Sequence, residues 1–271
     1  MGCPACTAPA DLTDLTDLTA DQATAHQHVE ASTQFASPEL IKAIVYEGLD
    51  AKHDPQWPTS GAVDVAEYGR WCGHCCGMAC LQMILQHRDG TAPDLIPLLH
   101  GARRHGAYVE QDDGSIKGLI YAPFVDYIGA DFGLTGQIHP QLPLDRLLEE
   151  LSPIQADEPV GQWTGRLIMA SVHREIRRPE RPAPGRGGHL VLITGHDPAA
   201  GTVTFHNPSG HTPAARAATL TTAQFETFYA GRGVTVTLTL AYQAMLPLCS
   251  MKVPDGASAG RCAAATTTAA A

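Results

Sequence analysis

The residues best suited to chemistry lie between Trp71 and His87, where the chain reads WCGHCCGMACLQMILQH and holds four of its eight cysteines. Positions 76, 79, 80, 83, 84 and 87 share one face of an α-helix. Cys76 would then occupy the first turn, where unpaired backbone N–H groups and the positive end of the helix dipole favour a thiolate. We therefore expect Cys76 to be a nucleophile. The alternative is that Cys76 and Cys80 are simply small buried residues.

The same stretch also contains the pattern of a redox-active cysteine pair. Trp71-Cys72-Gly73-His74-Cys75 is a W-C-G-H-C string, which thiol–disulfide oxidoreductases of the thioredoxin class carry between a strand and a helix. In that interpretation Cys72 attacks a disulfide and Cys75 resolves it. A Cys76 nucleophile would need a histidine and a carboxamide or carboxylate from the rest of the chain. A Cys72/Cys75 redox pair would instead need the partner proline of a disulfide oxidoreductase.

Composition limits the kinds of partner and compartment. The 271-residue chain is 44% hydrophobic and 17% charged, with a net charge of −10 at pH 7. That charge argues against nucleic acid and anionic membranes as main partners. No apolar run approaches the roughly 18 residues of a membrane span, and no basic segment followed by an apolar one marks a secretory signal. We expect a cytoplasmic protein with reduced thiols.

The sequence predicts one domain, over residues 37–245, between a disordered arm (1–36) and a disordered tail (246–271). The arm repeats Asp-Leu-Thr three times, and the tail ends in Ala and Thr. Cys3 and Cys6 form a C-x-x-C in the arm, which could complete a four-thiolate zinc site with the W-C-G-H-C cysteines. The gap between the two pairs far exceeds the usual spacing of about 15–20 residues. We therefore favour incidental thiols and no metal.

Helical periodicity dominates the first part of the domain and strand patterns the second. Helices are predicted from Pro38 onward and over 76–87, 93–105, 118–128 and 143–151. Strands are predicted over 166–173, 189–195, 202–206 and 234–242, and residues 177–188 form a loop rich in Pro, Arg and Gly. A turn at 197–201 makes the second and third strands an antiparallel hairpin. Helices followed by an antiparallel sheet make an α+β fold, unlike the interleaved elements of a thioredoxin.

His189 and Asn207 are the candidate partners of the nucleophile. Gly187 and Gly188 precede His189 and a mostly apolar strand follows it, so the imidazole would project from the mouth of that strand. Asn207 ends the next strand before Pro208, and the hairpin brings it near His189. A carboxamide there could accept an imidazole N–H and fix the tautomer that activates a thiol. Each residue also has an ordinary interpretation, as a histidine that starts a strand and as an Asn-Pro turn.

Two of these segments resemble a known family. The stretch C-G-x-A-C-L-x-M from Cys76, and GHLVLITG from Gly188 with the later Asn207-Pro208, are similar to the signatures of papain-like cysteine peptidases of the bacteriocin-leader-processing (double-glycine peptidase) type. The resemblance covers about residues 68–242, and the segments 118–124 and 228–233 look like those of actinobacterial relatives. It implies a papain-like α+β fold, with N-terminal helices around a central nucleophile helix that packs on an antiparallel sheet.

The resemblance also implies roles for individual residues. Cys76 is the nucleophile that forms a thioester with a peptide or acyl substrate, His189 the general base and acid, and Asn207 the residue that orients the imidazole. The expected function is hydrolysis of a peptide or amide bond without a cofactor. The alternatives are acyl or amide transfer by the same residues, disulfide exchange through Cys72 and Cys75, and a catalytically silent binding domain.

The chain departs from the family pattern at one position. A glutamine six residues before the nucleophile usually donates a hydrogen bond to the oxyanion, and Arg70 stands there instead. The oxyanion could still be held by the Cys76 backbone N–H together with Arg70 or the Trp71 indole. Loss of one such donor typically costs about 2.7–4 kcal/mol, so the identity of the donor affects the expected rate.

Overall fold

The computed structural model describes residues 24–25, 29–157 and 162–241, and the structural statements below concern these residues. The helices are α1 (Ile41–Tyr46), α2 (Val65–Trp71), α3 (Cys76–Asp89), α4 (Leu95–Arg104), α5 (Tyr121–Phe132), α6 (Leu144–Leu148), α7 (Pro213–Arg216) and α8 (Thr222–Phe228), with short 3-10 turns η2 (Pro38–Leu40), η3 (Ala51–His53), η4 (Trp57–Ser60), η5 (Cys72–His74) and η6 (Arg174–Arg177). The strands are β1 (Thr24–Ala25), β2 (Val109–Glu110), β3 (Ile116–Lys117), β4 (Thr135–His139), β5 (Ser152–Asp157), β6 (Gln162–His173), β7 (Gly188–Asp197), β8 (Thr202–His206), β9 (Ala217–Thr221) and β10 (Tyr229–Ala241).

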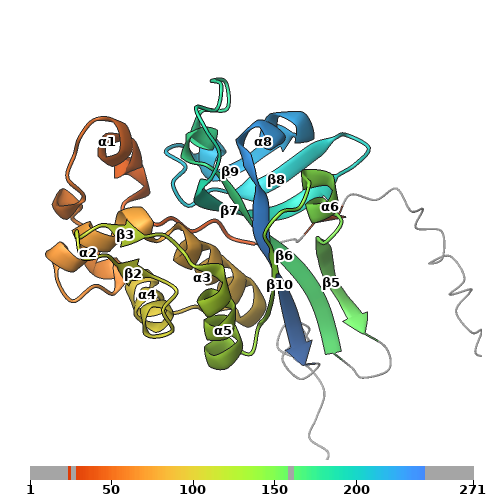
Figure 1. The fold of residues 1–271 in the computed structure, drawn as a ribbon, viewed down its shortest axis with the longest axis horizontal. Helices are drawn as coiled ribbons and strands as arrows, with labels where there is room; N and C mark the ends of the chain where they lie inside the picture. The colour runs from red at the N-terminus through yellow and green to blue at the C-terminus, as the bar shows by residue number, and fades with distance from the viewer. Residues whose placement is uncertain (1–23, 26–28, 158–161, 242–271) are drawn as a thin grey trace, which may run out of the picture.

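A large antiparallel sheet forms one side of the molecule, and α1 to α5 gather on the other (Figure 1). Its strand order is β4-β10-β6-β7-β8-β9, with β5 added to β6 and β1 added to β7. β6 pairs with β5 through its first part and with β7 through its last, where Val172 lies opposite His189. The predicted α+β class and the predicted β7–β8 hairpin are both confirmed.

α3 is the central helix and is buried on nearly all sides. The sequence pattern predicted one apolar face, yet Met78, Leu81 and Leu85, which lie off that face, are also at most 1% exposed. The reason is that α4 contacts the helix as well as β6, β7 and β10 of the sheet. A Cβ on Gly77 would lie 2.8 Å from a Leu119 methyl, so glycine there allows the close approach of the first turn. The helix that begins at Cys76 is thus held from several directions.

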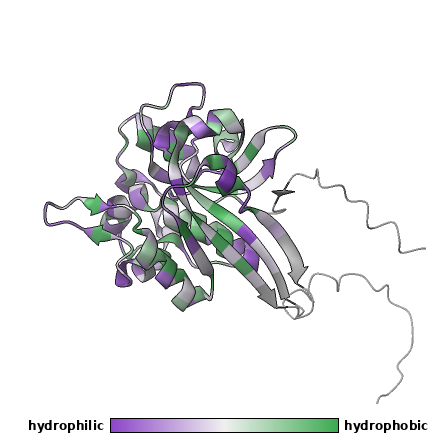
Figure 2. Cartoon of the chain, turned by 45° about the vertical axis from the view of Figure 1, so that its right-hand side comes forward, coloured by the Kyte–Doolittle hydropathy of each residue, from purple (hydrophilic) through white to green (hydrophobic). Residues whose placement is uncertain are grey.

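Hydrophobic side chains form one large core between the sheet and the helices and a smaller cluster beneath α1 and α2. Figure 2 shows hydrophobic colour along the inner strands and helices, and hydrophilic colour in many of the connecting segments. In the part of the chain that the structure describes, no helix has both the length and the apolar character needed to cross a membrane.

The packed chain begins before residue 37, where the arm was predicted to end. Gln34 and Phe35 are 3% and 5% exposed, and the Val29 carbonyl accepts a hydrogen bond from His206 Nε2 at 2.8 Å. The polar composition that suggested disorder therefore misjudged residues 29–36, which have their own apolar anchors. The rest of the arm, apart from β1, and the predicted tail lie outside the described residues.

Residues 38–64, between Gln34 and α2, form a segment of short helices that we call the excursion. The segment packs around a buried carboxylate. The buried Asp54 carboxylate accepts hydrogen bonds from Ser37 N at 2.9 Å, Ser37 Oγ at 2.6 Å and Tyr68 Oη at 2.7 Å. Burial opposes the ionised form of Asp54, but these donors hold its pKa below the usual value. The excursion then leads into α2 and back to the start of α3.

Several elements were not predicted, among them the strands β4, β5 and β9 and the helix α8. β4 and β9 are five residues long and rich in Thr, Gly or Ala. Pairing with β10 and β8 stabilises these two strands, although their own composition has little preference for the strand conformation. The predicted strands at 166–173 and 234–242 are parts of the longer β6 and β10, as far as residue 241.

Candidate active site

A cleft of about 1030 Å³ lies between the helical side and the sheet, and Cys76 and His189 both line it. Its walls come from the first turn of α3, the start of β7, the segment 117–121 before and at the start of α5, η6, and the excursion around α1. Asn207 lies directly behind His189. The structure therefore brings together the three residues that the sequence singled out.

Cys76 is the first residue of α3 and is partly exposed, whereas the other three described cysteines are buried. The backbone N–H of Leu190, one residue after His189, donates toward the Cys76 sulfur. Burial raises the pKa of the Cys76 thiol, although the backbone N–H groups of Leu190 and Gly77 act in the opposite direction. The expected preference for a thiolate at the helix terminus is thus outweighed by desolvation, and the thiol form is favoured.

His189 stands at the start of β7 and is 5% exposed. The two residues before it, Gly187 and Gly188, have φ values of 79° and 88°, a left-handed conformation that glycine adopts without strain. Its Nε2 atom lies 2.8 Å from Asn207 Oδ1 and 3.1 Å from Ser209 Oγ. Burial, and then the charge of Arg177, lower the pKa of His189 to about 3. The imidazole is therefore neutral at physiological pH.

The hydrogen bonds around Asn207 fix the tautomer of that imidazole. The Ser209 backbone N–H can only donate, and it lies 3.0 Å from Asn207 Oδ1, so this atom must be the carboxamide oxygen. An oxygen can only accept from His189, which places the imidazole hydrogen on Nε2. The remaining nitrogen, Nδ1, then carries a lone pair, as a general base requires.

Ser209 belongs to this arrangement, although the sequence pattern predicts only a turn after Asn207. Its hydroxyl lies 3.2 Å from Asn207 Oδ1, and its side chain lines the cleft. The sequence signal was the serine two residues after the asparagine, where a turn directs its N–H back to the carboxamide. The Ser209 hydroxyl therefore lies within hydrogen-bond distance of both His189 and Asn207.

Gln34 is a second cleft residue that sequence reasoning missed. Its side chain is 3% exposed, its Nε2 donates to the Cys72 carbonyl at 2.8 Å, and its buried Oε1 has no hydrogen-bond partner among the described residues. Gln34 lies 38 positions before Cys72 in sequence. It comes beside the start of α3 only because the excursion returns the chain to that point. No local spacing rule could have found it.

Arg70 and Trp71, the expected oxyanion donors, do not line the cleft. The Arg70 side chain is directed to the β2–β3 hairpin, where its Nε lies 3.2 Å from Glu110 Oε1 and its Nη2 donates to the Gly114 carbonyl. Trp71 is 3% exposed, and its ring lies against the Arg103 guanidinium at 4.4 Å. Arg70 is thus held by the β2–β3 hairpin and Trp71 by Arg103 of α4, so their positions give no support to the expected role.

Cys72 and Cys75 are buried free thiols. Burial raises the pKa of Cys72 to about 12 and raises that of Cys75 well above its ordinary value. Attack on a disulfide needs a thiolate, so both shifts oppose redox chemistry. Within the described ranges no group of three or more His, Cys, Asp or Glu side chains could hold a metal ion. Cys3 and Cys6, the other half of the considered zinc site, lie outside those ranges.

Comparison with known proteins gives limited similarity. No protein-family model matches the sequence, and no curated protein does. The peptidase domain of Streptococcus ComA, a bifunctional ABC transporter of a quorum-sensing pathway, is similar at 12% identity and a TM-score of 0.37, over 60% of this chain and 90% of that one. A C39-like peptidase from Bacillus anthracis is similar at 13% identity and a TM-score of 0.38, over 60% and 88%. The roles of individual residues therefore rest on the geometry described above.

Proposed function

We propose that this chain is a papain-like cysteine hydrolase that cleaves a peptide or amide bond through a thioester on Cys76. One observation carries the proposal: His189 Nε2 lies 2.8 Å from Asn207 Oδ1, at the wall of the cleft that the Cys76 thiol also lines. A thiol, a neutral imidazole with one free nitrogen, and a carboxamide that orients it are the components of thiol-based acyl chemistry.

In the proposed first step the Cys76 sulfur attacks the substrate carbonyl while its proton moves to His189 Nδ1. Because burial favours the neutral forms of both groups, we infer that the proton moves during attack. The imidazolium is stabilised by Asn207 Oδ1 and then gives its proton to the departing amine. Water, activated by the same nitrogen, hydrolyses the thioester and releases Cys76.

The tetrahedral intermediate needs hydrogen-bond donors for its oxyanion. We propose the Cys76 backbone N–H, which lies in the first turn of α3, where a helix offers its N–H groups no acceptor of its own, and the side-chain amide of Gln34. Two facts support Gln34: its amide is buried in the same cleft, and one of its two N–H hydrogens is used by the Cys72 carbonyl. The second hydrogen is then available to the substrate oxygen.

The test is capture of the acyl-enzyme. A panel of peptide esters is incubated with the full chain, and the mass of the intact protein is followed after an acid quench. We expect an acyl adduct that maps to Cys76, is absent from Cys76→Ala, and persists in Cys80→Ala, which removes a buried thiol one turn further along α3. Free acid as product indicates hydrolysis, and an amide formed with an added amine indicates transfer. Adducts that survive in Cys76→Ala would refute the proposal.

A further inference from the structure

The cleft has the opposite charge to the chain as a whole. The chain carries a net charge of −10, yet a single carboxylate, Glu175, is found beside five cationic side chains among the residues that line the cleft: Lys117, Arg174, Arg177, Arg178 and Arg232. A concave site lined by one sign of charge concentrates ligands of the other sign. The excess of positive charge is therefore a property of the cleft itself.

Arg177 is the buried member of this set. Arg177 is only 7% exposed, and its Nε and Nη1 atoms are buried without a hydrogen-bond partner among the described residues. Its guanidinium lies 5.6 Å from the centre of the Tyr46 ring. An unpaired buried cation is costly, and structures seldom keep one without a partner. Its charge also acts on both Cys76 and His189.

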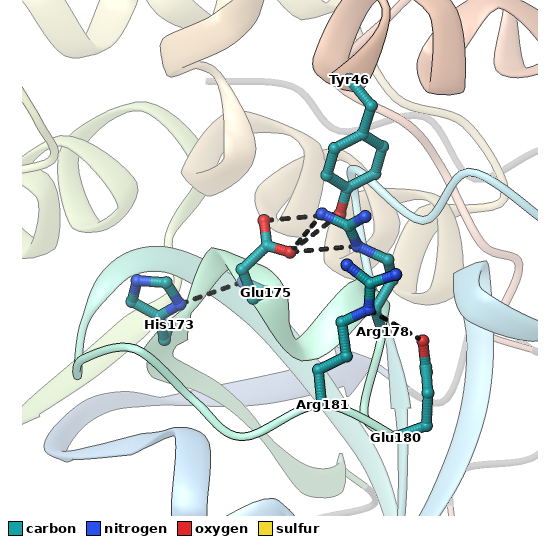
Figure 3. Close-up of polar contacts among 6 residues, drawn as sticks. All are labelled: Tyr46, His173, Glu175, Arg178, Glu180 and Arg181. Atoms are coloured by element: carbon teal, nitrogen blue, oxygen red, sulfur yellow. Dashed lines mark hydrogen bonds and ion pairs between the residues drawn. The ribbon is translucent and has the colours of Figure 1, made fainter.

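Glu175, the nearest candidate partner in the cleft, is occupied by another arginine. Its Oε2 accepts from Arg178 Nε at 3.1 Å and from Arg178 Nη2 at 2.7 Å, and its carboxylate also lies within 3.4 Å of the Tyr46 hydroxyl. Figure 3 shows the Glu175 carboxylate joined to both the Arg178 guanidinium and the Tyr46 hydroxyl. In the part of the chain that the structure describes, no ion pair involves Arg177. Tyr46 and Glu175 act on the Arg177 guanidinium, but its Nε and Nη1 atoms remain for a group from outside.

We propose that Arg177 binds an anionic oxygen group of the substrate, a carboxylate or a phosphate, close to the carbonyl that Cys76 attacks. The inference rests on the proposed function and narrows its substrate class to acyl compounds or peptides with a negative charge near the reacting bond. Arginine suits this role because its planar guanidinium stays charged when buried and matches the oxygens of carboxylate and phosphate groups.

Two alkylating reagents of nearly equal shape test the inference directly. Iodoacetate and iodoacetamide both place a carbon on the Cys76 sulfur and release iodide, but only iodoacetate carries a carboxylate. We expect the rate ratio of iodoacetate to iodoacetamide at Cys76, measured by peptide mapping, to exceed that of free cysteine about tenfold, as one nearby unit charge at intermediate dielectric implies. The ratio cancels differences in thiol reactivity, because the same sulfur reacts in both cases.

Variants separate Arg177 from the general charge of the protein. Arg177→Gln should lower the ratio severalfold, to the smaller excess that the other cations of the cleft produce, and Arg177→Lys, which keeps the charge, should retain most of the wild-type ratio. Arg181→Gln removes a cation from an exposed side chain of the following loop that does not line the cleft, and should leave the ratio unchanged. Circular dichroism monitors folding, and the wild-type ratio is informative without any variant.

The outcomes distinguish this inference from the proposed function. A wild-type ratio equal to that of free cysteine, or one unaffected by Arg177→Gln in a folded protein, overturns the anion site while acyl-enzyme formation on Cys76 still stands. Failure of both reagents to reach Cys76 overturns the proposed function as well. Protection of Cys76 from iodoacetamide by glutarate, or instead by inorganic phosphate, at matched ionic strength identifies the kind of anion, and no protection by either contradicts the inference.

Discussion

Replacement of Gln34 by methionine tests the proposed oxyanion site most sharply. Methionine has a similar length and volume but no N–H group, so Gln34→Met removes the donor with little change in packing. Gln82→Met is the matched control. The Gln82 amide also donates to a backbone carbonyl, that of Pro93 at 3.0 Å, but Gln82 does not line the cleft.

The expected magnitudes for rate and stability differ widely. Loss of the hydrogen bond to the Cys72 carbonyl should lower the free energy of unfolding by about 1 kcal/mol, and removal of the unpartnered Gln34 Oε1 offsets part of that loss. Loss of an oxyanion donor should slow acylation about 10²–10³-fold, equivalent to about 2.7–4 kcal/mol. A loss of about 1 kcal/mol in stability leaves the protein folded, so the change in rate can be measured separately from the change in stability.

The assay compares two reactions of the same sulfur. Acylation of Cys76 by a peptide ester passes through an oxyanion, whereas alkylation by iodoacetamide does not. We expect Gln34→Met to slow acylation alone, and Gln82→Met to slow neither reaction. An acylation rate within about tenfold of wild type, or an equal loss in both reactions, would show that Gln34 only supports the structure.

Three further predictions concern the other groups. His189→Ala should slow acylation about 10²–10⁴-fold, Asn207→Ala should slow it less, and the double variant should match His189→Ala; multiplied effects would contradict a shared role. The folded-state pKa of His189 is about 3 and its ordinary value is 6.5, so the unfolded chain binds more protons between these two pH values. The free energy of unfolding, measured with urea, should therefore fall as the pH is lowered below about 6.5, and it should fall less steeply in His189→Gln. Replacing Cys72 and Cys75 by alanine should preserve acylation; insulin-disulfide reduction lost in that variant would favour the redox interpretation.

The elements that could be predicted are those with a local signal. Cys76, Ala79, Cys80, Met83 and Ile84 repeat with helical spacing, and α3 begins at the predicted residue. The strand at 202–206 matches β8 at both ends, because alternation and a turn before it depend on neighbouring residues alone. The proximity of Asn207 to His189 followed from the same hairpin, so the imidazole contact was predictable too.

The elements that could not be predicted depend on distant partners. Gln34 reaches the cleft because Asp54 and Tyr68 fold the excursion back toward α3, and nothing near Gln34 in sequence records that path. Arg177 stands in a stretch with several arginines, and its burial beneath Tyr46 of α1 selects it from the others. Helical spacing likewise marked one face of α3, whereas burial of its other faces depends on α4 and the sheet.

The position of β10 in the sheet has a consequence for synthesis of the protein. It is the last described strand along the chain, yet it lies between β4 and β6. A nascent chain that ends before Tyr229 has already made α3, His189 and Asn207, but it leaves the facing edges of β4 and β6 without a partner. Such edges attract other chains, and their pairing requires a long loop to close late. Completion of the sheet on the ribosome must therefore wait for β10, and the Cys76 thiol gains its complete surroundings only after that strand has been made.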